Sequence, residues 1–262
     1  MTMLQEIIEN KRKKVEQQKQ LYPTKLLEQS IYFDSKCVSL SHYLTRKDKS
    51  GIIAEFKRKS PSKGVINAYA DVLETTLGYM QAGASALSVL TEQDYFMGKS
   101  EDLTIARNAN YCPILRKDFT VDEYQIIEAK SIGADAILLI AAALEKDQIK
   151  NLHQLAKSLG LEVLFEIHGK DELDKVPDSD LIIGVNNRNL KTMEVDLKTS
   201  FDIINELPKT SLLISESGLS NVEDVKQLKE AGYQGFLMGE HFMRTPNPAE
   251  ALKQFITKLN AL

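Results

Sequence analysis

Four glycines in this chain each follow a stretch of helical character and precede a short apolar run. Gly83, Gly133, Gly160 and Gly232 lie in the segments QAGASALSVL, SIGADAILLI, SLGLEVLFEI and EAGYQGFLMG. A glycine directly after a helix is the usual left-handed C-terminal cap. The separations of 50, 27 and 72 residues are near two, one and three multiples of about 25 residues. A repeat of that length is typical of one strand–helix unit in an α/β barrel.

The repeat, once its missing multiples are filled, predicts eight strands separated by helices. One intervening segment places Val222, Val225 and Leu228 three residues apart, which is the spacing of one helix face. Most of the predicted strands are continuous apolar runs, as expected for parallel strands buried on both faces. These runs are Ile52–Phe56, Ala86–Leu90, Pro113–Leu115, Ala136–Ile140, Glu162–Ile167, Leu181–Val185, Leu212–Ser215 and Gly235–Met238.

Strands that alternate with helices favour parallel pairing through right-handed crossovers. A chain of 262 residues has room for eight such units, enough to close a barrel. We therefore predict the α/β class, with a single (β/α)8 TIM barrel domain over residues 1–262. The pattern alone leaves an open doubly wound sheet as the structural alternative.

Residues 1–50 precede the first predicted strand. Helical character is strongest around Leu4–Gln20 and Thr24–Gln29, with Pro23 between them. No tract rich in Gly, Ser or Pro separates this region from the rest, so we predict a helical N-terminal extension packed on the barrel. The basic run Lys11–Lys14 follows apolar residues at helical spacing, and we interpret it as the solvated side of the first helix.

Composition and charge exclude several classes of function. The formal net charge is -4, so the chain has no overall electrostatic reason to bind nucleic acid or anionic lipid. Cys37 and Cys112 stand apart without CxxC spacing, which argues against a disulfide framework or a structural zinc site. No apolar run reaches the ~18 residues of a membrane span, and no signal peptide is evident. We expect a cytoplasmic protein, with a monomer as the default state.

Polar residues collect late in, or directly after, the predicted strands. Catalytic groups of (β/α)8 barrels lie at these C-terminal strand ends. Glu55 within IIAEFK and Glu166 within VLFEIH are the most informative, because an unpaired buried carboxylate costs several kcal/mol. Buried ionisable groups tend to cluster at functional sites, so we predict a functional role for both. Further polar residues at strand ends are Lys57, Lys117, His168, Asn186, Arg188 and Glu216.

The last two predicted strands carry a signal for phosphate. SESG and LMGE place Gly218 and Gly239 just after these strands, and a short segment at 241–244 follows. That segment is suited to the small extra helix at which many barrels bind phosphate, and glycines let backbone N–H groups approach phosphate oxygens. We expect a phosphorylated substrate. No HxH, HExxH, GxGxxG or Walker pattern predicts a metal or a nucleotide.

Segments along nearly the whole chain, including the helical extension, resemble one enzyme family. IIAEFKRKSPSKG is similar to the first-strand signature of indole-3-glycerol-phosphate synthases. LTEQDYFMG, PILRKDF, LFEIH, GVNNRNLKT, SESG and FLMGEHFMR resemble later strand-end motifs of that family, in the same order and at similar spacing. The clearest variation is Glu240, where some members have Ser.

The resemblance implies a carboxy-lyase of tryptophan biosynthesis. The family closes the pyrrole ring of 1-(2-carboxyphenylamino)-1-deoxyribulose 5-phosphate, releases carbon dioxide and water, and leaves indole-3-glycerol phosphate. It uses no cofactor and no metal. The implied ligand is a small phosphorylated molecule, and other enzymes of the tryptophan pathway stay open as partners.

The resemblance also implies catalytic roles for individual residues. Lys117 matches the general acid that protonates the substrate ketone. Glu166 matches a group of the later acid–base stage, for which Lys57 has also been considered. Lys57 can instead pair with the carboxylates that neighbour Lys117 or with the substrate carboxylate. Glu55 and Glu216 resemble buried carboxylates that hold lysines and substrate hydroxyls.

Other residues match the part of the family's site that binds and positions the substrate. Asn186 resembles a hydrogen-bonding positioner, while Arg188 and Ser60 resemble anion binders. Phe96 and Phe119 would sandwich the anthranilate ring. The residues that match the phosphate cradle are Ser217, Gly218, Gly239 and Glu240.

Two other hypotheses fit a phosphate-binding barrel. The first is phosphoribosylanthranilate isomerase, whose chemistry uses a Cys and an Asp, whereas the first predicted strand offers Glu55 and Lys57, and Cys112 precedes the third strand. The second is a binding or scaffold protein that kept the fold but lost the activity. The intact set of Lys57, Lys117 and Glu166 argues against it, and an activity assay distinguishes the two.

Overall fold

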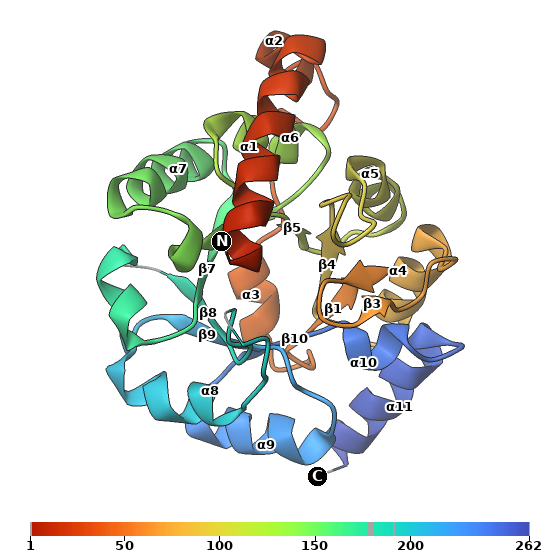
Figure 1. Ribbon diagram of the computed structural model, residues 1–262. Coiled ribbons are helices and arrows are strands. Elements are labelled where there is room, and N and C mark those ends of the chain that lie inside the picture. Colours follow the sequence, from red (N-terminus) through yellow and green to blue (C-terminus); the bar gives the residue numbers. More distant parts are fainter. Residues whose placement is uncertain (1, 178–180, 191, 262) are drawn as a thin grey trace.

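Eight parallel strands close into a barrel in the order β1-β10-β9-β8-β7-β6-β5-β4. The computed structural model describes residues 2–177, 181–190 and 192–261. Figure 1 shows the strands at the centre and the helices in a ring around them. This architecture confirms the predicted (β/α)8 TIM barrel and excludes the open sheet. The strands are β1 (Ile52–Phe56), β4 (Ala86–Leu90), β5 (Ile114–Lys117), β6 (Ala136–Ile140), β7 (Glu162–Ile167), β8 (Ile182–Asn186), β9 (Leu212–Glu216) and β10 (Gly235–Met238).

Helices of varied length connect the strands. Several begin with a side-chain cap: Asp71 accepts from the N–H of Glu74, and Asn221 accepts from the N–H of Asp224. Among the described residues, no helix combines the length and apolar character needed to cross a membrane. The helices after β1 are α4 (Val72–Gln81), α5 (Ser100–Ala109), α6 (Glu123–Ser131), η1 (Ala141–Ala143), α7 (Lys146–Ser158), η2 (Lys170–Lys175), α8 (Lys198–Ile203), η3 (Ile204–Glu206), α9 (Val222–Ala231), α10 (Glu240–Met243) and α11 (Pro248–Asn260).

Three strands run further at their C-terminal ends than the apolar pattern predicts. Strand β5 ends at Lys117, β8 at Asn186 and β9 at Glu216. Each of these polar residues has a register partner on a neighbouring strand, so its backbone belongs to the barrel. A search for apolar runs stops too early at such positions, because the side chain is polar although the backbone is still in the sheet.

The four glycines of the repeat adopt the expected left-handed conformation. Gly83, Gly133, Gly160 and Gly232 have φ values of 101, 92, 76 and 120°. Helices α4, α6, α7 and α9 all end within two residues of one of them. The glycines therefore end the helices, as the sequence predicts, and turn the chain towards the next strand.

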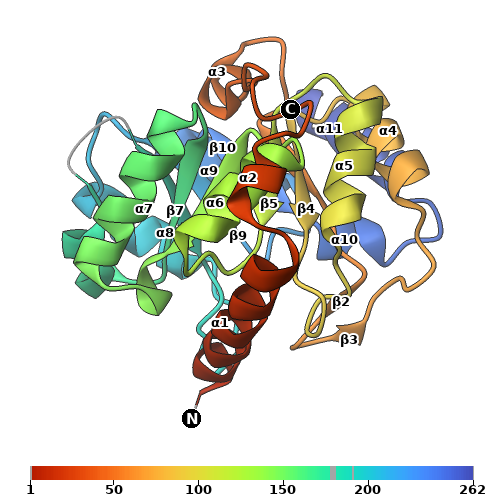
Figure 2. The same ribbon diagram turned by 90° about the horizontal axis from the view of Figure 1, so that it is seen from above.

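The N-terminal extension contributes helices at both ends of the barrel. Helix α1 (Met3–Leu21) crosses the end at which a small hairpin of β2 (Lys59–Ser60) and β3 (Gly64–Val65) lies, and α3 (Leu40–Thr45) covers the opposite end (Figure 2). A short helix α2 (Thr24–Leu27) follows α1. Leu40 and Leu44 of α3 are fully or almost fully buried in the inner core. That residues 1–50 and the barrel form one domain stays a prediction.

Lys11 corrects the interpretation of the basic run on α1. Arg12 and Lys13 are exposed, as expected, but Lys11 is buried. Its ammonium lies 2.7 Å from Oδ1 of Asp118, directly after β5, and 3.9 Å from Oε1 of Glu92. A buried cation is tolerated because this carboxylate compensates for lost hydration. The ion pair attaches α1 to the C-terminal end of the barrel.

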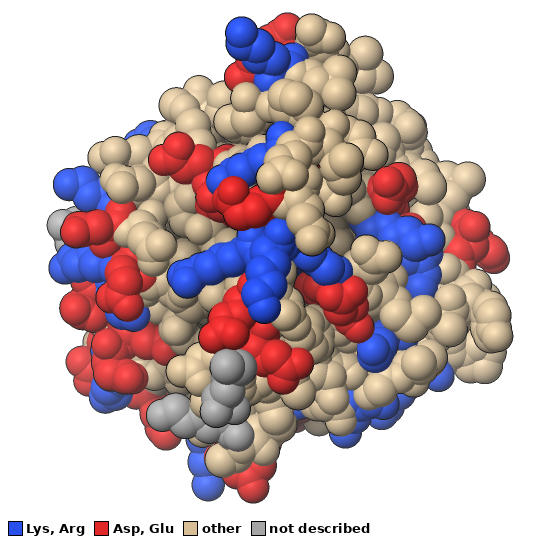
Figure 3. Space-filling view, turned by 45° about the horizontal axis from the view of Figure 1, so that its top comes forward, with Lys and Arg blue, Asp and Glu red and all other residues tan. Residues whose placement is uncertain are grey.

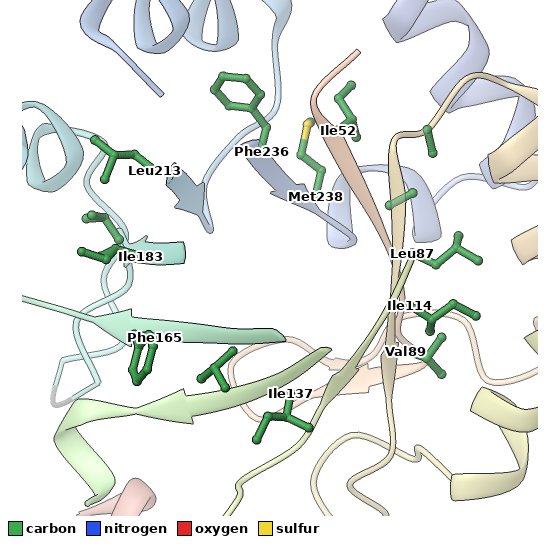
Figure 4. Close-up of a cluster of buried hydrophobic side chains, with 14 of the residues drawn as sticks. Ile52, Leu87, Val89, Ile114, Ile137, Phe165, Ile183, Leu213, Phe236 and Met238 are labelled. Carbon is green, nitrogen blue, oxygen red and sulfur yellow. The ribbon is translucent and has the colours of Figure 1, made fainter. Parts of the chain in front are cut away.

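Two layers of apolar side chains form the core. Along β1, Ile53 belongs to the inner layer, whereas Ile52 and Phe56 belong to the outer one, following the alternation of a strand. Figure 4 shows outer-layer side chains pointing from the strands towards the surrounding helices. The inner layer contains residues of the barrel strands together with the two α3 leucines, so the interior is filled up to the layer of the C-terminal strand ends.

A small hairpin after β1 was not predicted. Strands β2 (Lys59–Ser60) and β3 (Gly64–Val65) pair antiparallel. Gly64 has a φ of 67°, and Pro61 lies in the connecting turn. The segment PSKG carries the Pro and Gly signals of a turn, but the strands are too short to produce a pattern of their own.

Candidate active site

The pleat of the strands directs five predicted site residues into one layer of the barrel. Leu164 and Ile214 face the barrel interior, so Glu166 and Glu216, two positions further along their strands, face the same way. This layer lies at the C-terminal ends of the strands, above the apolar inner core. The same register brings in Glu55, Lys117 and Asn186.

One cavity at this end of the barrel is lined by all the residues to which the sequence assigns a catalytic or binding role. It lies beside α1, whose residues Met3, Leu4 and Ile7 form part of its wall. The predicted residues that line it are Glu55, Lys57, Ser60, Phe96, Lys117, Phe119, Glu166, Asn186, Arg188, Glu216, Ser217, Gly218, Gly239 and Glu240. The structure places them together, and the role of each stays a prediction.

Lys117 lies between two buried carboxylates. Its Nζ donates to Oε2 of Glu166 at 2.7 Å and to Oε2 of Glu216 at 3.0 Å. Burial alone would lower the pKa of Lys117, but Glu166, Glu216 and Glu55 raise it above its ordinary value. The ammonium therefore stays charged at neutral pH, and it gives up its proton only to a strongly basic atom.

The two carboxylates beside Lys117 differ in character. Burial opposes ionisation of Glu166, but Lys117 and His168 hold the pKa of its carboxyl well below the usual range. Burial and the neighbouring charges of Glu166 and Glu55 instead raise the pKa of Glu216 to about 7, against the pull of Lys117. Two carboxylates that share one cation do not ionise equally, so Glu166 is the more readily ionised carboxylate and Glu216 retains its proton more readily.

A second ion pair lies next to the first. Nζ of Lys57, just after β1, is 2.7 Å from Oε1 of Glu55, and Ser88 donates its hydroxyl to Oε2 of Glu55 at 3.3 Å. Gly239 leaves room for this carboxylate, because a Cβ at position 239 would lie 2.8 Å from Oε1 of Glu55. Lys57 thus pairs with Glu55, which was one of the alternatives for it.

Asn186 and Arg188 are held by hydrogen bonds at the end of β8. The amide of Asn186 donates to Oε1 of Glu166 at 3.1 Å, and its own oxygen accepts from the N–H of Arg188 at 3.0 Å. Arg188 donates through Nη1 to the carbonyl of Met193 at 3.1 Å. Its Nη2 is 3.9 Å from Oε2 of Glu240, a long contact that leaves the guanidinium available to an anion.

The turn after β9 has an unusual backbone. Ser217 and Gly218 have φ values of 67 and 82°, and Ser217 is among the few non-glycine residues with positive φ. A serine in this conformation is strained, and such residues concentrate at functional sites. Gly239 precedes the short α10, as the sequence predicts for the segment after β10. Both turns border the cavity.

Phe96 and Phe119 are in direct contact. Their ring centroids are 6.1 Å apart and the planes are tilted by 44°. A third ring between them would need about 7 Å, two van der Waals contacts of about 3.5 Å each. The gap between the rings as they stand is narrower than that, so the sandwich stays a prediction that requires the rings to move apart. Both rings line the cavity and form one aromatic wall.

Two contributions to the site were missed from the sequence. The first is the α1 side chains Leu4 and Ile7, whose helical spacing was visible but whose position over the cavity was not. The second is a role for His168, which the sequence places at a strand end without a function and whose ring lies 3.2 Å from the carboxylate of Glu166. Its position one residue after β7 was the only signal.

Charges of both signs surround the cavity mouth. Figure 3 shows Lys and Arg side chains gathered near the centre of this face, with Asp and Glu side chains directly beside them. Within residues 2–177, 181–190 and 192–261, no group of three or more His, Cys, Asp or Glu side chains is arranged to hold a metal ion. The arrangement is suited to proton transfer and to binding a small anionic molecule.

Comparison with known proteins identifies the family. The family model described as indole-3-glycerol phosphate synthase matches residues 4–255. A protein of that name from Bacteroides thetaiotaomicron is 48% identical over 254 residues, which cover 97% of each chain. The chain belongs to the indole-3-glycerol phosphate synthase family. Another relative of the same name, from Aliarcobacter butzleri, is 44% identical and aligns over 98% of this chain and 100% of its own.

Solved structures show the fold more broadly. A chain in a structure of the tryptophan synthase a2b2 complex from Pyrococcus furiosus superposes with a TM-score of 0.58 at 15% identity, and covers 82% of this chain and 99% of its own. A mutant tryptophan synthase alpha-subunit from the same organism gives a TM-score of 0.59. At this identity the likeness supports the barrel alone. Membership of the indole-3-glycerol phosphate synthase family makes this chain a carboxy-lyase of tryptophan biosynthesis that acts on a small phosphorylated substrate.

Proposed function

We propose that the cavity converts 1-(2-carboxyphenylamino)-1-deoxyribulose 5-phosphate into indole-3-glycerol phosphate, carbon dioxide and water, with the residues named above as its machinery. The single observation that carries the proposal is the ammonium of Lys117, which lies between Glu166 and Glu216 at the cavity wall. The reaction requires an acid at a ketone and a base later on. Both are present here in the form of paired side chains, and the proposed steps require no metal or cofactor.

Lys117 is the general acid of the first stage. The aromatic carbon that carries the carboxylate attacks the C2' ketone, and the ketone oxygen gains negative charge as the new carbon–carbon bond forms. The ammonium stabilises that charge and transfers its proton, leaving a hydroxyl. The developing alkoxide is a stronger base than the amine, so transfer is favourable although the pKa of Lys117 is raised. Loss of carbon dioxide then restores electrons to the ring.

Glu166 and Lys57 serve the second stage. The new hydroxyl leaves as water and a proton must be removed to complete the pyrrole. Glu166 is ionised, and it faces the cavity beside Lys117, which fits a base. Lys57 is held by Glu55 and is the second ammonium of the cavity, available to assist departure of the hydroxyl or to bind the substrate carboxylate.

Substrate anions bind around the rim. The strained turn at Ser217 and Gly218, together with Gly239 and Glu240, is the proposed cradle of the phosphate, with backbone N–H groups as donors. Arg188, whose Nη2 lies 3.9 Å from Glu240, supplies a forked cation to an anionic group. Other residues assigned to binding and positioning are Ser60 and Asn186.

The aromatic wall of Phe96 and Phe119 receives the anthranilate ring. Because these rings contact each other, the substrate ring packs along the side of the pair that faces the cavity, whose wall also includes Leu4 and Ile7 of α1. This arrangement keeps the apolar ring away from the charged layer and orients the attacking carbon towards Lys117.

We further propose that the protein works in the cytoplasm as a monomer, beside other enzymes of the tryptophan pathway. Its direct test is the purified chain with the carboxyphenylamino deoxyribulose phosphate in a buffer containing a chelator. Indole fluorescence should rise and carbon dioxide should be released in equal amount. Absence of indole product from folded protein would refute the proposed function.

A further inference from the structure

His168 lies between two carboxylates, on the side of Glu166 away from Lys117. Its Nε2 is 3.2 Å from Oε1 of Glu166, and its Nδ1 is 3.5 Å from Oε2 of Glu172 on η2. The backbone N–H of His168 also donates to Oε2 of Glu172 at 2.8 Å. Glu172 is thereby fixed by the residue whose ring it faces. Glu172, His168 and Glu166 form a continuous chain from η2 to the cavity.

The geometry indicates the charge of the ring. A neutral imidazole has one N–H and one lone pair, and the lone pair would face a carboxylate oxygen at one of its two ends. Both ring nitrogens are buried and face carboxylates, and within the described residues neither has a hydrogen-bond partner of good geometry. Only the imidazolium presents a proton to both sides.

The contacts around Glu166 support the same conclusion. Among the described residues, Glu166 shares the ammonium of Lys117 with Glu216, and its other partner Asn186 is neutral. Glu172 adds a second carboxylate on the far side of the ring. A cationic ring at position 168 compensates the carboxylates on both of its sides.

We propose that His168 is a positioning residue whose imidazolium, held between Glu166 and Glu172, keeps Glu166 ionised and fixes its Oε1, so that Oε2 faces Lys117 and the substrate. This inference rests on the proposed function, because it assigns a role relative to Glu166 as the base. His168 transfers no proton in it. The ring acts as a fixed charge behind the carboxylate. Groups that contact a catalytic side chain without touching the substrate commonly orient that side chain in this way.

The groups that face His168 set its pH dependence. Burial would lower the pKa of the imidazole, but Glu166 and Glu172 raise it to about 9. On η2, Lys175 turns away and donates to the carbonyls of Ala141 and Leu144. Because the folded pKa is raised, the cation is present at neutral pH and is lost as pH rises through about 9.

The first experiment compares the wild type with His168→Gln, which keeps an amide near Nε2 but carries no charge. We expect kcat of the variant to be about tenfold lower at pH 7, with a smaller change in KM, since the variant loses orientation of the base and not substrate contacts. The ratio of the two kcat values should approach one above about pH 9.5, where the wild type has lost the same charge. A ratio that stays constant at all pH values would overturn the proposal, since a merely structural defect behaves in that way.

A second measurement does not depend on turnover. In protein labelled with 15N at histidine, the His168 signals, assigned by their absence in His168→Gln, should show both ring nitrogens protonated at pH 7.5. Glu172→Gln should lower the pKa of His168 and move the alkaline limb of kcat to lower pH. Glu206→Gln is the matched control, because Glu206 pairs with Lys170 of the same η2 at an exposed site. This substitution should leave the pKa of His168 and the alkaline limb of kcat unchanged.

Different results refute the proposed function and the positioning role of His168. If the wild type forms no indole product, the proposed function fails whatever the state of His168. If the wild type is active but the His168 ring is neutral at pH 7.5, the positioning role is wrong and the function stands.

Discussion

Gly184 on β8 lies directly against Glu216 on β9: a Cβ at position 184 would come within 2.1 Å of Oε1 of Glu216. The same Cβ would lie 3.1 Å from Cδ1 of Leu164, so neither side offers space. The absence of a side chain at 184 therefore permits the Glu216 carboxylate to reach Lys117. A glycine inside a central strand is otherwise unfavourable, which indicates a close approach of this kind.

Gly184→Ala should displace the Glu216 carboxylate and lower kcat at least about tenfold, because the charges around the acid are disturbed. Overpacking should also cost about 1–3 kcal/mol of unfolding free energy. Gly235→Ala is the matched control: its Cβ would lie 2.7 Å from Ile214 and 3.4 Å from Leu44, in the apolar inner core. Gly235→Ala should lower the unfolding free energy, measured by denaturant titration, about as much as Gly184→Ala does, but its kcat should equal that of the wild type. Equal kcat values for the two variants would contradict this role of Gly184.

Gly218→Val tests the phosphate cradle. The φ of 82° is strained for valine, and the new Cβ would lie 2.5 Å from Cγ1 of Val195. We expect KM to rise at least about tenfold as the backbone is displaced from the phosphate, with a smaller change in kcat.

Gly160→Val is the control that separates loss of phosphate binding from the backbone strain of a valine with positive φ. Gly160 has a φ of 76° and nothing within 4 Å of its Cβ position, at the end of α7. It should lower the melting temperature without changing KM. Normal KM for folded Gly218→Val would show that the phosphate binds elsewhere.

Lys11→Ala tests the attachment of α1. Removing the ammonium leaves the buried Asp118 with Arg116, Thr91 and the backbone N–H of Phe119 as its remaining partners. We expect a loss of about 1–3 kcal/mol of unfolding free energy, the cost of a buried acceptor that loses one partner. Lys14→Ala removes the neighbouring, more exposed pair with Asp94 and should cost less than about 1 kcal/mol. Equal losses for the two variants, measured by urea titration, would argue against a structural role of the Lys11–Asp118 pair.

The order of the strands and the location of the cavity were predictable from the sequence because they depend on local signals. The glycine caps mark the ends of helices, and the apolar runs mark β1, β4, β6, β7 and β10 to the residue. The C-terminal ends of all parallel strands in a barrel lie at the same end, so polar residues at these ends lie close together. Lys117 and Glu166 could therefore be placed in one site without knowing any distance.

The remaining features depend on how distant segments meet. Nothing in the sequence near Lys11 indicates that Asp118 lies opposite. The basic run Lys11–Lys14 was therefore predicted to be solvated throughout. The contact of Phe96 with Phe119 depends on two separate loops. His168 acquires its second carboxylate only because η2 turns Glu172 back over the ring, a local fold that the segment GKDEL does not reveal.

The central claim is that Lys117 delivers the proton for ring closure, and the kcat of Lys117→Ala tests it most directly. The variant's folding should first be checked by circular dichroism, and turnover followed by indole fluorescence beside the wild type. We predict a loss of at least ~10²-fold in kcat, larger than any change in KM, since the ammonium acts mainly in the transition state. Lys117→Arg should not restore activity, because a guanidinium releases its proton too reluctantly. Near-normal turnover by folded Lys117→Ala would contradict the account.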